Sequence, residues 1–192
     1  MKKIIKNHFN RISEILKDSD YLIEKIENMS LLLKKKIRNN NKIFVCGNGG
    51  SFADASHFVG ELTATYSKKN RKPLPFILLG SNQAAVTAWS NDYNFEDYLT
   101  REFSTLYSKK DVLLIFSTSG GNLKKKQSVN LIKLAKFAKS KKLEILSLLG
   151  KGGGSIKNLS NKSIIIKSNN TASIQEMHKI IFHSICETLE NL

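Results

Sequence analysis

Cysteine and proline are scarce in this sequence, with two of each among 192 residues. Two cysteines, Cys46 and Cys186, are too few for the disulfide framework of a small secreted domain. We therefore expect a reducing compartment, the cytoplasm. With two prolines and eleven glycines, the composition is not that of a disordered or collagen-like chain. Apolar residues make up 41% of the chain, so we expect a single globular domain over residues 1–192.

Long apolar runs are missing as well. No run reaches the roughly 20 residues that cross a bilayer, which argues against a membrane protein. The chain begins with a basic Met-Lys-Lys, but no continuous apolar region or small-residue cleavage site follows. Apolar residues instead recur every three or four positions through residues 2–38, with a break expected at Ser19 or Asp20. This pattern predicts amphipathic helices rather than a signal peptide.

Acidic residues are fewer than basic residues. The sequence has 16 Asp and Glu against 31 Lys and Arg, which gives a net charge of +15. Such a charge can indicate a nucleic-acid partner. The basic residues are spread over the chain without interleaved aromatics, and no nucleic-acid-binding motif is present. We therefore expect no nucleic-acid partner. A solvated basic surface explains the charge, and its field would also favour a phosphorylated substrate.

From residue 42 onward, apolar strand-like runs alternate with helical patterns. The expected strands are residues 43–46, 76–79, 112–116, 143–149 and 164–166. The expected helices are residues 52–66, 95–107, 123–140 and 174–189. Alternation of this kind predicts an α/β fold with a five-stranded parallel sheet flanked by helices. Ligands in such folds bind beyond the carboxyl ends of the strands.

The first candidate site is the turn Gly47-Asn48-Gly49-Gly50-Ser51, which lies between the first strand and a helix. Glycines let a backbone approach a ligand closely, and a helix start can bind an anion. The turn lacks both the Lys-Ser/Thr ending of an NTPase phosphate loop and the glycine spacing of a dinucleotide fold. Taken alone, it could equally be an ordinary tight turn.

A second candidate is the hydroxyl run Ser117-Thr118-Ser119, which ends the third strand before Gly120 and the expected helix 123–140. Hydroxyls and the N–H groups of a helix start can together bind phosphate oxygens. The alternative is a serine helix cap with a glycine turn. That alternative explains one hydroxyl and leaves two unexplained, so we favour a phosphate site.

The third candidate joins two helices. His57 and Glu61 are four residues apart and share a helix face. Gln175 and His183 lie about two turns apart on the last helix. Two imidazoles and two side-chain oxygens could hold zinc or a similar ion, or a Glu and a His could act as base and acid. Buried, hydrogen-bonded histidines in amphipathic helices are the alternative.

Two further groups could support such a site. Glu176 lies nearly above His183 on the helix and could orient it. Asn91 and Asp92, expected in a loop after Trp89, could bind substrate hydroxyls or form a turn or cap.

Taken together, these segments resemble the phosphoheptose isomerases, a family with the sugar-isomerase (SIS) fold. The matching segments run in the family's order over nearly the whole chain. They are Cys46–Ser51, His57–Thr63, Asn91–Tyr93, Asp111–Gly120, Gly150–Gly153 and Ile174–His178 with His183. The resemblance implies a flavodoxin-like SIS fold and a homotetramer with sites between subunits. We expect the N-terminal region, residues 1–41, to pack on the core and to form the oligomer interface.

The resemblance also implies roles for individual residues. It implies one zinc ion per site, held by His57, Glu61, Gln175 and His183, and phosphate binding by Ser117, Thr118 and Ser119. Further substrate contacts are expected at Asn48, Gly49, Gly50, Ser51, Asn91, Asp92, Asn122, Gln175 and Glu61. The implied reaction converts sedoheptulose 7-phosphate to D-glycero-D-manno-heptose 7-phosphate through an enediol, for lipopolysaccharide or capsule. Such a reaction needs a base and an acid, and we assign these roles to Glu61 and His183.

The sequence departs from the family at four positions. Ala64-Thr65 replaces the usual Gly-Arg, Ser173 replaces an Arg, and Asn122 replaces a Ser. Loss of two Arg would remove charge-assisted contacts to oxyanions, for which Lys124, Lys125 and Lys126 could compensate if they lie in the first turns of the next helix. These departures favour, as an alternative, an isomerase of a different phosphosugar. A non-catalytic SIS protein that binds a replication initiator or another partner is the second alternative. The four candidate metal ligands argue against it.

Overall fold

The computed structural model describes residues 1–190 and contains one five-stranded parallel sheet. Its strands are β1 (Ile43–Cys46), β2 (Phe76–Leu78), β3 (Val112–Ser117), β4 (Glu144–Leu149) and β5 (Lys162–Ile165). Their order across the sheet is β2-β1-β3-β4-β5, and every neighbouring pair is parallel. The predicted fold class is therefore confirmed.

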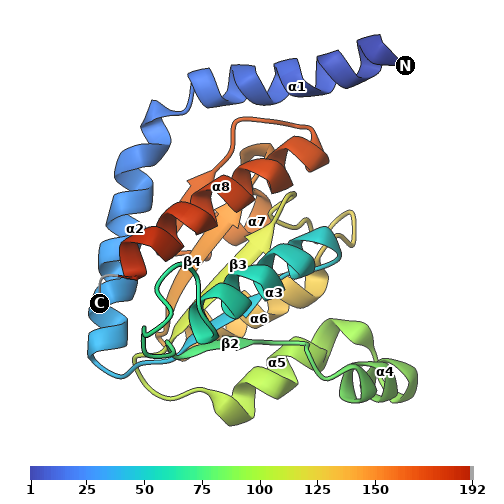
Figure 1. Cartoon of the computed structure of the whole chain (residues 1–192). Coiled ribbons are helices and arrows are strands. Elements are labelled where there is room, and N and C mark those ends of the chain that lie inside the picture. Colours follow the sequence, from blue (N-terminus) through green and yellow to red (C-terminus); the bar gives the residue numbers. More distant parts are fainter. Residues whose placement is uncertain (191–192) are drawn as a thin grey trace.

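Side chains of the central strands are buried on both faces of the sheet, as their apolar runs predict. Within β1, Ile43 and Val45 join the core on one face, and Phe44 and Cys46 join the core on the other. This division follows from the alternation of side chains along a strand. Each core is completed by helices, so the sheet lies between two helical layers (Figure 1).

The helices α3 (Gly50–Thr63) and α8 (Thr171–Leu189) cover the first face, together with α2 (Asp20–Arg38). The second face is covered by α5 (Phe95–Leu106) and α6 (Val129–Ser140), and α4 (Gln83–Asp92) packs beside α5. A short 3-10 turn (Lys151–Gly153) and α7 (Gly154–Lys157) follow β4. The helices α3 and α8 contact each other directly, and we call this line of contact the α3–α8 interface.

The N-terminal region forms two helices, α1 (Lys2–Lys17) and α2, and the expected break falls at Asp18 and Ser19. The second helix packs against α8 and β5, whereas α1 contacts α8 and runs out past the end of that helix (Figure 1). Apolar side chains on α1 are exposed, with Ile4 75% and Phe9 70% accessible.

The helix expected over residues 123–140 begins later, at Val129. Asn122 and Gln127 exchange backbone hydrogen bonds of 2.9 Å and close a turn between them. Within and after this turn, Lys126 and Ser128 have φ of 50° and 52°, a left-handed conformation that no α-helix can contain. Lys124, Lys125 and Lys126 consequently lie in the turn and not in a helix, which corrects the prediction.

Several other boundaries differ from the prediction by one to three residues, and one helix was missed. The helix expected over residues 52–66 runs from Gly50 to Thr63, which leaves Tyr66 in the following loop. The helix α4 was not predicted. It begins where the Asn82 side chain accepts a hydrogen bond from the Ala85 N–H at 3.2 Å, a helix N-cap. Asn91 and Asp92 end this helix, so their expected placement in a loop is wrong.

Residues 1–190 contain no helix that is both long enough and apolar enough to span a bilayer. Both cysteines are free and buried, Cys46 in β1 and Cys186 in α8. Burial raises the pKa of both thiols, that of Cys186 to about 12.

Candidate functional site

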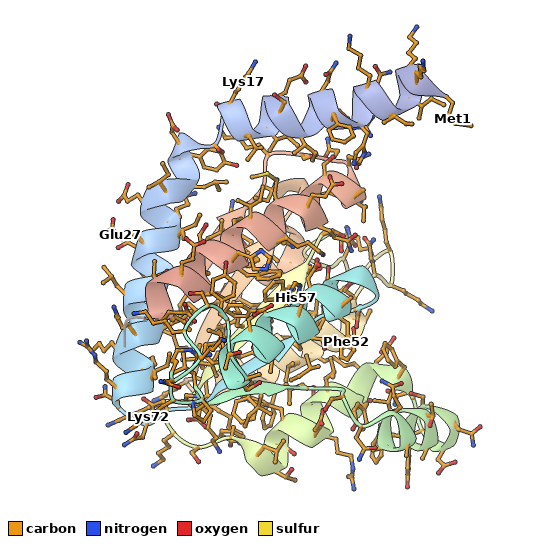
Figure 2. The ribbon with its side chains drawn as sticks, in the orientation of Figure 1. Met1, Lys17, Glu27, Phe52, His57 and Lys72 are labelled. Carbon is orange, nitrogen blue, oxygen red and sulfur yellow. The ribbon has the colours of Figure 1, made fainter. Side chains whose placement is uncertain are left out.

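Three of the predicted metal ligands meet at the α3–α8 interface. His57 and Glu61 lie one turn apart on α3, and His57 Nε2 is 2.8 Å from Glu61 Oε1. His183 faces them from α8, with its ring centroid 5.2 Å from that of His57. One potential ligand atom from each of the three residues lies within 4.8 Å of the others. In Figure 2, His57 lies on α3 where that helix runs alongside α8.

The surroundings of this cluster keep its imidazoles oriented. Phe182, which is fully buried, contacts the rings of His57 and His183 edge-on at 5.2 and 4.5 Å. Burial, followed by the neighbouring His57, lowers the pKa of His183 below its usual value. A neutral imidazole offers one N–H donor and one lone pair, and the lone pair is what a metal or a proton needs.

Gln175 lies on the same helix face, near the start of α3. A Cβ atom on Gly50 would come within 2.1 Å of the Gln175 amide nitrogen, so a larger residue at this position would displace the end of the Gln175 side chain. Gln175 on α8 therefore packs against Gly50, the first residue of α3, at the α3–α8 interface. Its role as a fourth ligand stays a prediction.

The hydroxyl run forms a compact turn at the carboxyl end of β3. Ser117 Oγ and Ser119 Oγ accept backbone hydrogen bonds from Gly120 and Gly121, each of 3.1 Å. Because these hydroxyls accept from the backbone, their own protons stay available for an anion. Thr118 is half-buried between them. The adjoining helix that was expected is replaced by the turn at 122–127, within which Asn122 Oδ1 accepts from Lys125 N.

The second glycine-rich segment supports this turn by backbone contact. A Cβ atom on Gly120, where φ is +66°, would lie 1.9 Å from the carbonyl oxygen of Gly153. Ile156 N donates to Gly120 O at 2.8 Å, and Ser155 N donates to Gly121 O at 3.0 Å. The glycines after β4 therefore let two chain segments touch without side chains between them.

The first glycine turn is tied to α6. The side-chain amides of Asn48 and Asn130 exchange two hydrogen bonds of 2.8 Å. Asn48 and Gly49 line a cavity of about 200 Å³ between this turn and helices α4 and α5. Ser51 is buried in the first turn of α3. Asn91 and Asp92 are exposed at the end of α4, where Asn91 Nδ2 donates to Asp92 Oδ1 at 2.9 Å.

Glu176 does not orient His183 as expected. Its Oε1 lies 2.6 Å from Nε2 of His8 on α1, which makes it a link between the N-terminal helix and α8. His178, the other C-terminal histidine, is fully buried against Phe116, and burial lowers its pKa to about 4.

Several residues beside the cluster were not found from the sequence. The Tyr66 ring stacks on that of His183, and Arg71, in the same loop, forms an ion pair with Glu190. Lys179 on α8 pairs with the buried Asp54 on α3. The stretch 68–72 was recognised only as a basic loop, and no local pattern distinguishes Arg71 from its lysine neighbours.

Comparison with known proteins agrees with this geometry. The SIS domain family model matches residues 7–150. "Phosphoheptose isomerase 1" of Campylobacter jejuni is 37% identical over 190 residues, covering 99% of this chain and 98% of that protein. A "Phosphoheptose isomerase" of Helicobacter pylori strain P12 is 40% identical over 188 residues, covering 97% of this chain and 94% of that protein.

Solved structures give the same result. A phosphoheptose isomerase from Francisella tularensis superposes with a TM-score of 0.91 at 28% identity, covering 99% of this chain and 98% of that chain. One from Neisseria gonorrhoeae superposes with a TM-score of 0.87 at 28% identity, covering 100% and 99%.

Proposed function

Since this chain belongs to the phosphoheptose isomerase family of SIS-domain proteins, we propose that it converts sedoheptulose 7-phosphate to D-glycero-D-manno-heptose 7-phosphate. The observation that carries the proposal is the cluster of His57, Glu61 and His183 at the α3–α8 interface. The product would supply heptose for lipopolysaccharide or capsule. A cytoplasmic location is supported by the two free, buried cysteines.

The reaction moves a proton between C1 and C2 through a cis-enediol. Glu61 is the proposed base, because its carboxylate is partly exposed at the cluster and can reach a bound sugar. His183 is the proposed acid and acts on the sugar oxygens. Its lowered pKa keeps the imidazole neutral, so that one ring nitrogen can hold a metal while the N–H of the other nitrogen donates a proton.

The donor set fits a metal ion. Two imidazoles and a carboxylate with atoms within 4.8 Å of one another are the ligands of a typical catalytic zinc site. We propose one zinc ion per site, held by His57, Glu61 and His183 with Gln175 as fourth ligand. Bound zinc would polarise the substrate carbonyl as a Lewis acid.

The substrate phosphate is assigned to Ser117, Thr118 and Ser119 at the carboxyl end of β3. Two of these hydroxyls accept from backbone N–H groups, which leaves their protons for phosphate oxygens. Assignment of the sugar contacts to the first glycine turn is supported by its place at the end of β1. The proposed sugar contacts are Asn48, Gly49, Gly50, Ser51, Asn91, Asp92, Asn122 and Gln175.

A homotetramer is part of the proposal. The exposed apolar residues of α1, such as Ile4 and Phe9, form a face that would be covered by another copy of the chain.

The test is incubation with sedoheptulose 7-phosphate in deuterated water, followed by NMR. We expect conversion and exchange of deuterium at C1 and C2, and we expect the Glu61→Gln protein to lose the exchange by at least about 100-fold. Glu144→Gln is the control, because Glu144 is the first residue of β4, outside the α3–α8 interface, and its replacement should leave exchange unchanged. Full exchange in Glu61→Gln would refute the role of Glu61 as base.

A second candidate is isomerisation of a different ketose phosphate, favoured by Ala64-Thr65 and Ser173. Ser173 is fully buried at the start of α8, where it cannot replace an arginine at a phosphate. A panel of ketose phosphates, assayed before and after chelation, separates the two candidates. A protein that binds no metal and turns over no member of the panel would instead support a non-catalytic partner-binding role.

A further inference from the structure

The loop between α3 and β2, residues 64–75, places an aromatic ring directly against His183. The Tyr66 ring stacks on the His183 imidazole, with centroids 5.9 Å apart and planes inclined by 26°. Tyr66 OH donates to Glu187 Oε1 at 3.4 Å, one turn beyond His183 on α8. Tyr66 thus covers one face of the His183 ring, and His57 and Phe182 make edge-on contacts with the same ring. Rotation of the imidazole would break this stacking.

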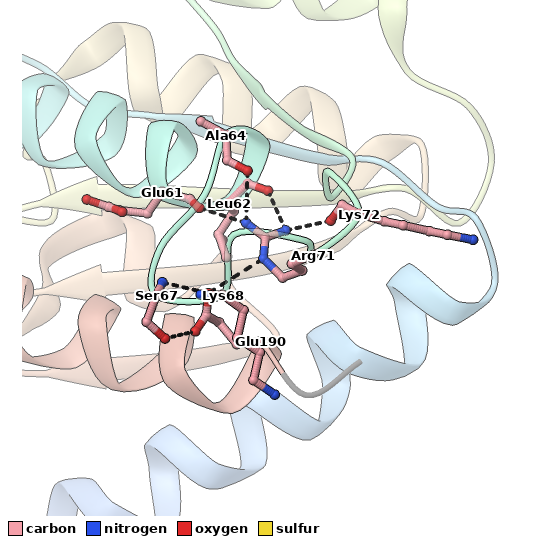
Figure 3. A network of polar contacts seen from close by, with 8 residues as sticks. All are labelled: Glu61, Leu62, Ala64, Ser67, Lys68, Arg71, Lys72 and Glu190. Carbon is pink, nitrogen blue, oxygen red and sulfur yellow. Dashed lines mark hydrogen bonds and ion pairs between the residues drawn. The ribbon is translucent and has the colours of Figure 1, made fainter.

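A buried ion pair fixes the 64–75 loop. The side chains of Arg71 and Glu190 are each 4% exposed, and Arg71 Nε lies 3.8 Å from Glu190 Oε1. Glu190, at the end of α8, also accepts hydrogen bonds from the backbone N–H groups of Ser67 and Lys68 and from the Ser67 hydroxyl. The two residues that follow Tyr66 are therefore attached to α8 (Figure 3).

The same arginine caps α3. Its Nη atoms donate to the carbonyl oxygens of Glu61 at 2.8 Å, Leu62 at 3.0 Å and Ala64 at 3.4 Å (Figure 3). The last carbonyls of a helix have no partner within it, and a positive charge is favourable at this end. Arg71 thus holds the backbone of Glu61 and the loop bearing Tyr66 in one network.

We propose that Tyr66 is a positioning residue for His183, and that the Arg71–Glu190 pair holds Tyr66 in place. By restricting rotation of the imidazole ring, Tyr66 keeps the lone pair of His183 directed toward His57 and Glu61. Preorganised ligands lose less freedom on binding, so the stacked ring raises metal affinity. This inference rests on the proposed function in one respect, the assignment of His183 as a metal ligand.

The test compares zinc dissociation constants, measured by chelator competition, in the full-length protein. We expect Tyr66→Leu to weaken zinc binding by at least about tenfold, the effect typical of groups that orient a ligand. Tyr66→Phe keeps the ring and loses only a long hydrogen bond, so we expect it to stay within about twofold of the wild type. Tyr107→Leu is the matched control, because Tyr107 stacks on Phe103 in the other core.

A second measurement uses metal-free protein and is independent of activity. The stacked ring shields the His183 ring protons, so Tyr66→Leu should shift their NMR signals downfield and leave those of His178 in place. Arg71→Lys keeps the charge and loses the fork of donors, and it should cause the same shift. If Arg71→Lys fails to fold, the Tyr66 variants still decide the question.

His183→Ala separates this inference from the proposed function. If His183→Ala loses zinc while Tyr66→Leu binds it as tightly as the wild type, the positioning role is overturned and the metal site stands. If His183→Ala itself binds zinc normally, the ligand assignment and this inference both fail. Weakened binding in both variants, with Tyr66→Phe unaffected, supports the proposal.

Discussion

At the scale of single residues, the Asp54–Lys179 ion pair links α3 to α8, and its two side chains differ in their exposure to solvent. The Asp54 side chain is 1% exposed, whereas that of Lys179 is 48% exposed. Asp54 Oδ2 has no hydrogen-bond partner within residues 1–190. The carboxylate therefore depends on the ammonium group for its stabilisation, while the ammonium group is also hydrated.

This asymmetry predicts which substitution destabilises the protein more. Lys179→Met leaves a buried carboxylate unpaired and should lower the free energy of unfolding by about 3 kcal/mol. Asp54→Asn leaves an ammonium group that water can solvate, and it should cost about 1 kcal/mol. Urea unfolding of both variants measures the difference. Equal losses, or a larger loss in Asp54→Asn, would contradict this account.

His178 predicts a dependence of stability on pH. Its pKa is about 4 in the folded protein against an ordinary value of 6.5, because burial disfavours the charged ring. Between these values the unfolded chain binds more protons, so stability falls as pH drops from about 6.5 to 4. His178→Gln should reduce this slope by up to about 1.4 kcal/mol per pH unit. An unchanged slope in urea unfolding across this range would show that His178 titrates normally.

At the scale of elements, the parallel sheet was predictable because each strand is a short apolar run between turn residues. His57 and Glu61 were placed correctly because their spacing lies within one helix. The late start of α6 was not predictable, since the left-handed conformations of Lys126 and Ser128 are set by the Asn122–Gln127 turn. Tyr66 and Arg71 act through contacts with distant helices, and periodicity carries no information on such contacts.

Two glycines of α3 differ in their surroundings, so we expect different effects when each is replaced by alanine. A Cβ atom added by Gly50→Ala would overlap the Gln175 amide and displace it, so we expect weaker zinc binding, by about tenfold, if Gln175 is a ligand. Around Gly60, the described residues leave open space within 4 Å of an added Cβ atom. Gly60→Ala should therefore stabilise the protein by about 0.5–1 kcal/mol through helix propensity. Chelator competition and thermal unfolding of both variants provide the measurements.

At the scale of the whole molecule, α1 is a helix none of whose residues is buried. It contacts α8, where His8 pairs with Glu176, and it presents Ile4, Ile5 and Phe9 to solvent. A helix with an exposed apolar stripe gains stability only when another surface covers that stripe. The proposed homotetramer supplies such a surface.

Charge placed on this stripe should disrupt assembly. We expect the double variant Ile4→Asp, Phe9→Asp to sediment as a smaller species than the wild type, because burial of two carboxylates without partners is costly. Asn10→Asp, on the opposite side of α1, introduces a charge that stays in water and should leave the sedimentation coefficient unchanged. A double variant that sediments like the wild type would exclude α1 from the assembly interface.

The two buried cysteines have a practical consequence. A thiol whose pKa is raised by burial reacts slowly with alkylating reagents, because the thiolate is the reactive form. Modification of Cys46 or Cys186 thus requires local opening of the structure around it. Cys46 lies in the central part of the sheet and Cys186 lies three residues after His183 on α8. The chain therefore carries one natural reporter for the opening of its sheet and another for the helix that bears its candidate site.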